Sequence, residues 1–116
     1  MLKAFVPAFM TLLVLSTGAA AADGRKIFQL QCRTCHLPKS ALVGPSLVGV
    51  ANRPIAGLSD YAYSPALKGK SGNWTDENLD AYLASPRKFA PGTRMPGSWP
   101  VAADRAAVIA YMKTLN

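Results

Sequence analysis

The sequence has 116 residues, which is room for one domain and no more. Its 13 basic and 6 acidic residues give a formal charge of +7 at pH 7. The chain has no long run of Lys or Arg, no glycine-rich phosphate loop and a single histidine, which argues against nucleic-acid binding, phosphate transfer and Ser–His catalysis. A basic chain of this kind is better suited to acidic protein partners.

Residues 1–22 have the pattern of a secretory signal peptide. Lys3 provides a charged start, an apolar run extends from Ala4 to Leu15, and Ala20-Ala21-Ala22 resembles a cleavage site. Pro7 interrupts the apolar run, which is shorter than the ~20 residues of a membrane-spanning helix. We therefore expect cleavage of residues 1–22, with the domain at residues 23–116 exported to the periplasm. An uncleaved anchor is the alternative.

The first predicted helix covers residues 24–35, where apolar or cysteine positions recur at 27, 28, 32 and 35. It runs into the segment Cys32-Arg33-Thr34-Cys35-His36. A Cys-x-x-Cys pair followed at once by His is typical of covalent attachment of a c-type haem. The two thiols bond to the porphyrin, and the adjacent imidazole coordinates the iron.

Three other interpretations of this segment are weaker. A redox dithiol of the thioredoxin type would follow a strand, and no strand-like run precedes Cys32. A structural zinc site needs four ligands, usually Cys and His, and the chain has only 2 cysteines and 1 histidine. A plain disulfide between Cys32 and Cys35 stays possible, but it leaves His36 unexplained.

The middle of the chain combines a long loop with short helices. Residues 37–58 are rich in Pro and Gly, so this loop needs a surface to lie on, which a haem face would provide. Ser64-Pro65 predicts the start of a short helix that ends near Lys68. Thr75 caps a further helix, and Ser85-Pro86 stops it. Its expected apolar face consists of Leu79, Tyr82 and Leu83.

Met95 is the predicted second iron ligand. His36 is the only histidine, so a second imidazole is excluded, and haem iron also accepts a methionine sulfur. Met1 and Met10 lie in the predicted leader, and Met112 occupies a helical position where core packing is expected. Met95 lies between Pro91-Gly92 and Pro96-Gly97, in a stiff loop that can present one side chain inward.

The last predicted helix covers residues 102–115, with Asp104 in its first turn and Lys113 in its last, as the helix dipole favours. Gly24 would allow this helix to approach the first one closely. The apolar stripe of this last helix consists of Val101, Ala102, Val108, Ile109, Met112 and Leu115. The acidic residues are expected at helix starts and exposed turns, where they cap rather than catalyse. No alternating strand pattern is found, so the expected fold class is all-α.

In this order, the motifs resemble a small mono-haem class I cytochrome c across essentially all of residues 23–116. The matching residues are Gly24, Phe28, the turn Gly44-Pro45-Ser46-Leu47, Arg53, Tyr63, Trp74, Tyr82 and the loop Pro91-Gly92-Thr93-Arg94-Met95. The resemblance implies the cytochrome c fold, with short helices and loops wrapped around one covalently bound haem.

The resemblance also implies roles for single residues. The carbonyl of Pro45 would accept the imidazole N–H of His36, and Tyr82 would lie near the axial sulfur. Arg53, Tyr63 and Trp74 would surround a haem propionate, because a buried carboxylate needs charged or hydrogen-bonding partners. Two positions depart from the commonest pattern: Arg94 replaces a lysine, and Pro96-Gly97 replaces a more apolar pair.

The implied function is that of a soluble one-electron carrier and not an enzyme. Its single haem c, attached through Cys32 and Cys35, would cycle between Fe(II) and Fe(III) by outer-sphere transfer. A dehydrogenase or membrane complex would be the donor, and an oxidase or reductase of a respiratory chain the acceptor. Two alternatives stay open: a haem enzyme or gas-binding protein with a labile sixth ligand, and a dedicated cytochrome subunit of one enzyme.

The expected partners are acidic redox proteins that bind a monomer transiently, including respiratory complexes met at a membrane surface, and no nucleic acid. Four cations lie near the two ligand segments: Arg33, Arg87, Lys88 and Arg94. If a haem edge is exposed between these segments, the four cations would frame it and steer an acidic partner.

Overall fold

Helices are the only regular elements in the residues that the computed structural model describes, which are 2–5, 7 and 22–116. Outside the helices, these residues form only two isolated bridges, Ala41 with Gly44 and Pro54 with Asn73. The all-α prediction is confirmed. No helix among the described residues is both long and apolar enough to cross a membrane. The predicted signal peptide falls largely outside the described residues.

The first helix is shorter and less regular than predicted. It begins as α1 (Gly24–Ile27), where the Asp23 carboxylate accepts a hydrogen bond from the Lys26 N–H at 3.2 Å. It continues as η1 (Phe28–Cys32), a wider turn closed by an i to i+5 hydrogen bond from Arg33 N–H to the Phe28 carbonyl at 2.9 Å. The prediction of a helix through residue 35 is therefore wrong at its end. Wide turns of this kind are frequent at functional sites.

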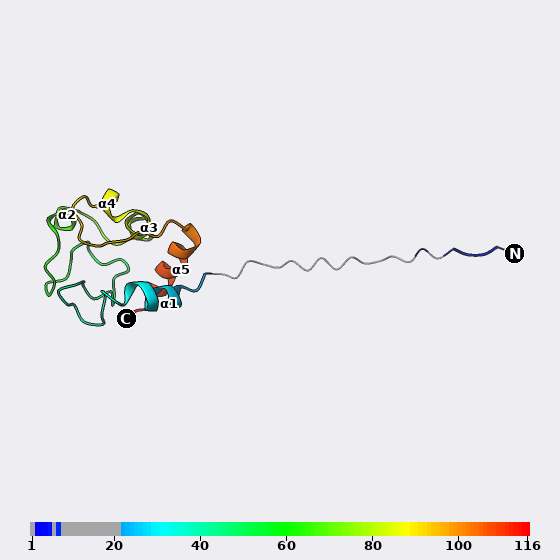
Figure 1. Cartoon of the computed structure of the whole chain (residues 1–116), viewed down its shortest axis with the longest axis horizontal. Helices are drawn as coiled ribbons and strands as arrows, with labels where there is room; N and C mark the ends of the chain where they lie inside the picture. Colours follow the sequence, from blue (N-terminus) through cyan, green and yellow to red (C-terminus); the bar gives the residue numbers. More distant parts are fainter. Residues whose placement is uncertain (1, 6, 8–21) are drawn as a thin grey trace.

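The close contact predicted for Gly24 is present. It faces α5 (Ala102–Met112), and a Cβ added to Gly24 would lie 2.0 Å from the Ala107 carbonyl oxygen. Figure 1 shows α1 and α5 crossing next to each other at one side of the molecule. The predicted end of α5 at Leu115 is wrong. The helix ends at Met112, and Leu115 N–H closes a turn on the Met112 carbonyl at 3.1 Å.

Replacing Gly24 with alanine should lower the free energy of unfolding by about 1–3 kcal/mol, because the methyl group has no space and the two helices must separate. Denaturant titration of the haem-loaded protein measures this loss. Gly69→Ala is the matched control, since its Cβ would meet its nearest atom, the Pro65 carbonyl oxygen, at an ordinary 3.4 Å. Equal losses in both variants would contradict the close-approach argument.

Three short helices form the opposite side of the molecule (Figure 1). α2 (Pro65–Lys68) begins after Ser64, whose hydroxyl accepts from Leu67 N–H at 3.3 Å, as predicted. α3 (Asp76–Ala84) begins after Thr75, whose hydroxyl accepts from Asn78 N–H at 3.2 Å. α4 (Pro86–Phe89) was not predicted. Pro86 does stop α3, but its fixed φ also suits the first position of a new helix.

The expectation that the acidic residues lie at helix starts and exposed turns is wrong for Asp80. It lies inside α3, and its carboxylate pairs with the Arg105 guanidinium at 2.7 Å. This pair links α3 to α5. Asp76 and Asp104 do occupy first turns, as predicted.

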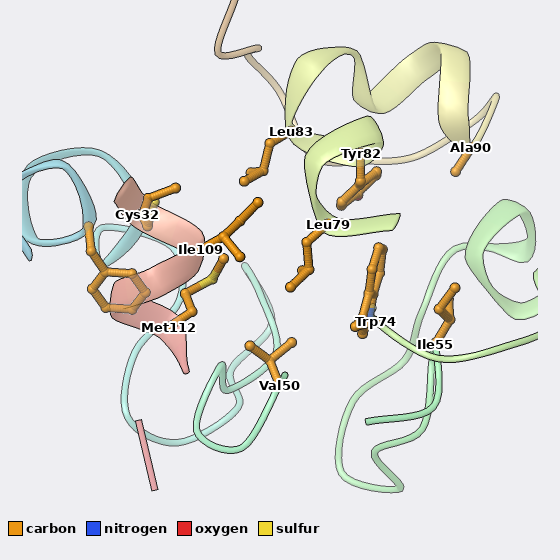
Figure 2. Close-up of a cluster of buried hydrophobic side chains, with 12 residues drawn as sticks. Cys32, Val50, Ile55, Trp74, Leu79, Tyr82, Leu83, Ala90, Ile109 and Met112 are labelled. Atoms are coloured by element: carbon orange, nitrogen blue, oxygen red, sulfur yellow. The ribbon is translucent and has the colours of Figure 1, made fainter. Parts of the chain in front are cut away.

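The core lies between α3 and α5. Figure 2 shows Leu79, Leu83 and Ile109 directed toward this space, with Cys32 near α5 and Trp74 beside α3. Buried side chains come from both helices, from η1 and from the loops. Elements far apart in the sequence therefore meet around one centre.

Candidate functional site

The predicted ligand residues share one cavity. It has a volume of about 260 Å³, and its lining includes Cys32, Cys35, His36 and Met95. The first three come from η1 and the turn that follows it, whereas Met95 comes from the loop between α4 and α5. Two segments about sixty residues apart therefore face one space, and the rest of its wall is mostly apolar.

His36 is held in one orientation by a backbone carbonyl. Its Nδ1 lies 2.9 Å from the Pro45 carbonyl oxygen. Since a carbonyl only accepts, Nδ1 carries the proton and Nε2 keeps its lone pair for a metal. Burial lowers the pKa of His36 and outweighs the hydrogen bond to Pro45, which raises it, while the charge of Arg53 lowers it further. The ring is therefore neutral at pH 7, as a ligand must be.

Gly44 allows this arrangement. A Cβ at this position would lie 2.8 Å from the Cys35 carbonyl oxygen and 3.2 Å from His36 Nδ1. A side chain here would push the turn away from His36 and Pro45. Gly44 is therefore required in the predicted Gly-Pro turn because no side chain fits at this position.

Cys32 and Cys35 are not joined by a disulfide. Cys32 is buried and Cys35 half-buried, and burial raises the pKa of Cys32 to about 11. A dithiol that exchanges electrons needs a thiol of lowered pKa, and burial shifts the pKa of Cys32 in the opposite direction. The geometry therefore disfavours the thioredoxin-type interpretation.

Met95 is half-buried and lies in a loop with its own hydrogen bonds. Tyr82 Oη and Thr93 Oγ1 are 2.7 Å apart, and the Met95 N–H points to the same Thr93 oxygen at 3.4 Å. Arg94 reaches back to donate to the Ala62 carbonyl. Met112, by contrast, is 4% exposed, belongs to the packed core and does not line the cavity.

Tyr63, Trp74 and Tyr82 all line the cavity, as does Pro45. Tyr63 Oη accepts from Leu58 N–H at 3.3 Å, and the Trp74 and Tyr82 rings are 5.2 Å apart. Burial raises the pKa of Tyr82, so its hydroxyl stays protonated. Trp74 and Tyr82 thus form one aromatic part of the lining, and Tyr63 contributes another, paired with Tyr61.

Arg53 is the exception among the predicted site residues. It does not line the cavity; it lies behind the lining, donating to the Val48 carbonyl at 3.1 Å and to the Ser46 carbonyl at 3.0 Å. Its Nε is buried and has no hydrogen-bond partner among the described residues. Since buried donors are normally paired, this atom could serve a bound carboxylate. The propionate role of Arg53 stays a prediction.

The residues present fit a covalently bound haem. Two thiols, a neutral oriented imidazole and a thioether share one largely apolar cavity, and a buried guanidinium N–H lacks an acceptor. Sequence reasoning assigned no site role to several other residues of this lining, among them Gln31, Thr93 and Trp99. Thr93 belongs to the loop motif, but no sequence pattern shows its contact with Tyr82.

Comparison with known proteins agrees with this geometry. The cytochrome c family model matches residues 21–116. Cytochrome c-type cyt cy of Rhodobacter capsulatus is 48% identical over 101 residues, covering 85% of this chain and 50% of that protein. Cytochrome c of Euglena viridis is 40% identical over 99 residues, covering 83% and 97%. This chain thus spans half the length of the Rhodobacter relative and nearly all of the Euglena one.

A solved structure gives the same result. Cytochrome cH from Methylobacterium extorquens superposes with a TM-score of 0.74 at 38% identity. The match covers 84% of this chain and 99% of that one. The helical arrangement is therefore shared along the whole of the smaller protein.

Proposed function

Because this chain belongs to the cytochrome c family, and is thus an electron carrier with one covalently attached haem c, we propose that it shuttles single electrons between proteins outside the cytoplasm. The donor would be a dehydrogenase or membrane complex, and the acceptor an oxidase or reductase. Removal of the leader at residues 1–22 would release the carrier into the periplasm.

The observation that carries this proposal is the convergence of His36 and Met95 on one cavity, each from a segment with its own hydrogen bonds. If His36 and Met95 both held the haem iron, no position on it would stay open for a substrate. This favours outer-sphere transfer over catalysis or gas binding.

Each residue then has a defined task. Cys32 and Cys35 anchor the haem, and Pro45 keeps the His36 ring in its orientation. Leu79 and Leu83 contribute apolar wall that excludes water. Arg53, behind this wall, has an Nε that is unpaired among the described residues and would donate to a propionate. The haem, when bound, supplies an iron that gains and loses one electron. The protein contributes fixed ligands, so little has to rearrange when the charge changes.

A potentiometric titration followed by absorbance tests the proposed function. The oxidised and reduced forms should interconvert in a single reversible step with a slope of one electron. A two-electron slope, or a reduced form that cannot be reoxidised by an electron acceptor, would contradict a simple carrier.

The docking face is the second part of the proposal. Arg33, Arg87, Lys88 and Arg94 are all exposed. Only Arg94 lines the haem cavity, where it is tied to Ala62, whereas Arg33 lines a smaller cavity on the other side of His36. Arg87 and Lys88 on α4 precede the Met95 loop by a few residues and form no ion pair with other described residues. We propose that these two cations steer acidic partners.

Charge reversal at Arg87 or Lys88 should slow association with an acidic redox partner. The rate should also fall with salt, because the Debye length shrinks from ~30 Å at 0.01 M to ~8 Å at 0.15 M. Stopped-flow kinetics at both ionic strengths measures this. Lys26→Glu on α1 is the control, because Lys26 is exposed and does not line the cavity. Lys113 is unsuitable because it pairs with Asp76 at 2.6 Å. If Lys26→Glu slows association as much as the changes on α4, the effect depends on net charge alone and the proposed docking face is contradicted.

A further inference from the structure

Trp99 holds the segment that follows Met95. Its backbone N–H donates to the Leu83 carbonyl of α3 at 2.9 Å, and its own carbonyl accepts from Arg105 Nη1 at 2.9 Å. Arg105 Nη1 also donates to the Pro100 carbonyl at 3.0 Å, and its Nε pairs with Asp80 at 2.7 Å. The backbone at Trp99 is thus fixed to both α3 and α5.

The indole of Trp99 makes a separate contact with the opposite edge of the cavity. Its Nε1–H donates to Gln31 Oε1 at 2.7 Å, although the two residues are 68 positions apart. Gln31 directly precedes Cys32, and both Gln31 and Trp99 line the haem cavity. This hydrogen bond therefore joins the segment with the haem-attachment cysteines to the segment with Met95. We call it the Gln31–Trp99 bridge.

The Met95 loop needs a downstream anchor. On its upstream side, Thr93 and Arg94 are held by Tyr82 and the Ala62 carbonyl. On its downstream side, Gly97 has a positive φ of 89°, a conformation that glycine adopts without strain. No hydrogen bond of residues 96–98 to other described residues is present. Trp99 is thus the first fixed point after Met95.

We propose that Trp99 is a positioning residue for Met95, and that the Gln31–Trp99 bridge keeps the Met95 loop closed over the cavity. This inference rests on the proposed function, because it takes Met95 as the sixth ligand. The bridge acts by stabilising the closed loop against local opening, in which Met95 leaves the iron while the rest of the fold persists. Nothing in the sequence pattern points to this pair.

Imidazole binding to the oxidised, haem-loaded protein tests the bridge, because an external ligand can bind only when Met95 has moved away. Trp99→Phe keeps a ring but removes the N–H, and Gln31→Leu removes the acceptor. Each should raise the apparent imidazole association constant about 2- to 10-fold, the range that follows from losing one hydrogen bond. The double variant should show no further increase, because both changes remove the same bond.

Gln29→Leu is the matched control. Gln29 is an exposed glutamine in the same turn η1, and its side chain makes no hydrogen bond to the described residues. It should leave imidazole binding unchanged. The free energy of unfolding is measured in parallel for every variant.

Two results would overturn the proposal. If Trp99→Phe and Gln31→Leu lower the free energy of unfolding but leave the imidazole association constant unchanged, the bridge supports the fold without holding Met95. If wild-type protein binds imidazole without losing its iron–sulfur charge-transfer absorption, Met95 is not the displaced ligand. That second result would overturn the proposed ligation together with the bridge.

Discussion

Met95→Leu is expected to open the sixth coordination position of the iron. Leucine has nearly the same volume as methionine but no sulfur lone pair, so the loop can keep its packing while the ligand is lost. The iron–sulfur charge-transfer absorption of the oxidised protein should disappear. The potential should fall by a sizeable part of the ~0.8 V range that axial ligands set, because methionine favours the reduced state.

Met112→Leu is the matched control for this change. Met112 is buried among core side chains of α5 and does not line the cavity, so the same substitution there should leave the absorption and the potential unchanged. Absorption spectra and a redox titration of both variants provide the comparison. The reverse pattern would show that the ligand assignment chose the wrong methionine.

The protein without haem should be largely unstructured. Among the described residues, the longest helices are α5 and α3 with 11 and 9 residues, and the others have 4 or 5. Isolated helices shorter than ~12–15 residues are marginal in water, so these need a shared core to pack on. Trp74, Tyr82 and Leu83 line the cavity, so without the haem their cavity-facing surfaces would have nothing to pack on.

Far-ultraviolet circular dichroism of the Cys32→Ala, Cys35→Ala variant, freed of haem, measures this dependence. We expect most of the helical signal of the haem-loaded protein to be lost, and to be regained only when haem is present. A native-like helical signal without haem would show that the polypeptide core is sufficient on its own.

The sequence predicted the parts of this structure that depend on local chemistry. The Cys-x-x-Cys-His segment, the caps at Ser64 and Thr75 and the close approach at Gly24 each follow from a few neighbouring residues. The start of α4 could also have been predicted, because Pro86 suits a first helical position as well as a helix end. The same residue type supports both interpretations, and only the three-dimensional context decides between them.

The contacts that were missed join residues far apart in the chain. The Asp80–Arg105 pair spans 25 positions, and the Gln31–Trp99 bridge spans 68. No periodicity or motif encodes which polar side chains will meet once the helices pack. The widened turn η1 was missed for a different reason, since its residues have an ordinary helical pattern.

The central claim is that the protein binds a haem covalently and that His36 and Met95 both coordinate its iron. The absorption spectrum of the reduced wild-type protein, recorded with and without carbon monoxide, tests this claim most directly. With both positions filled, the spectrum should not change when carbon monoxide is added at neutral pH. A prompt change to the spectrum of a carbon monoxide complex would show an open sixth position, and it would contradict the assignment of this protein as a simple electron carrier.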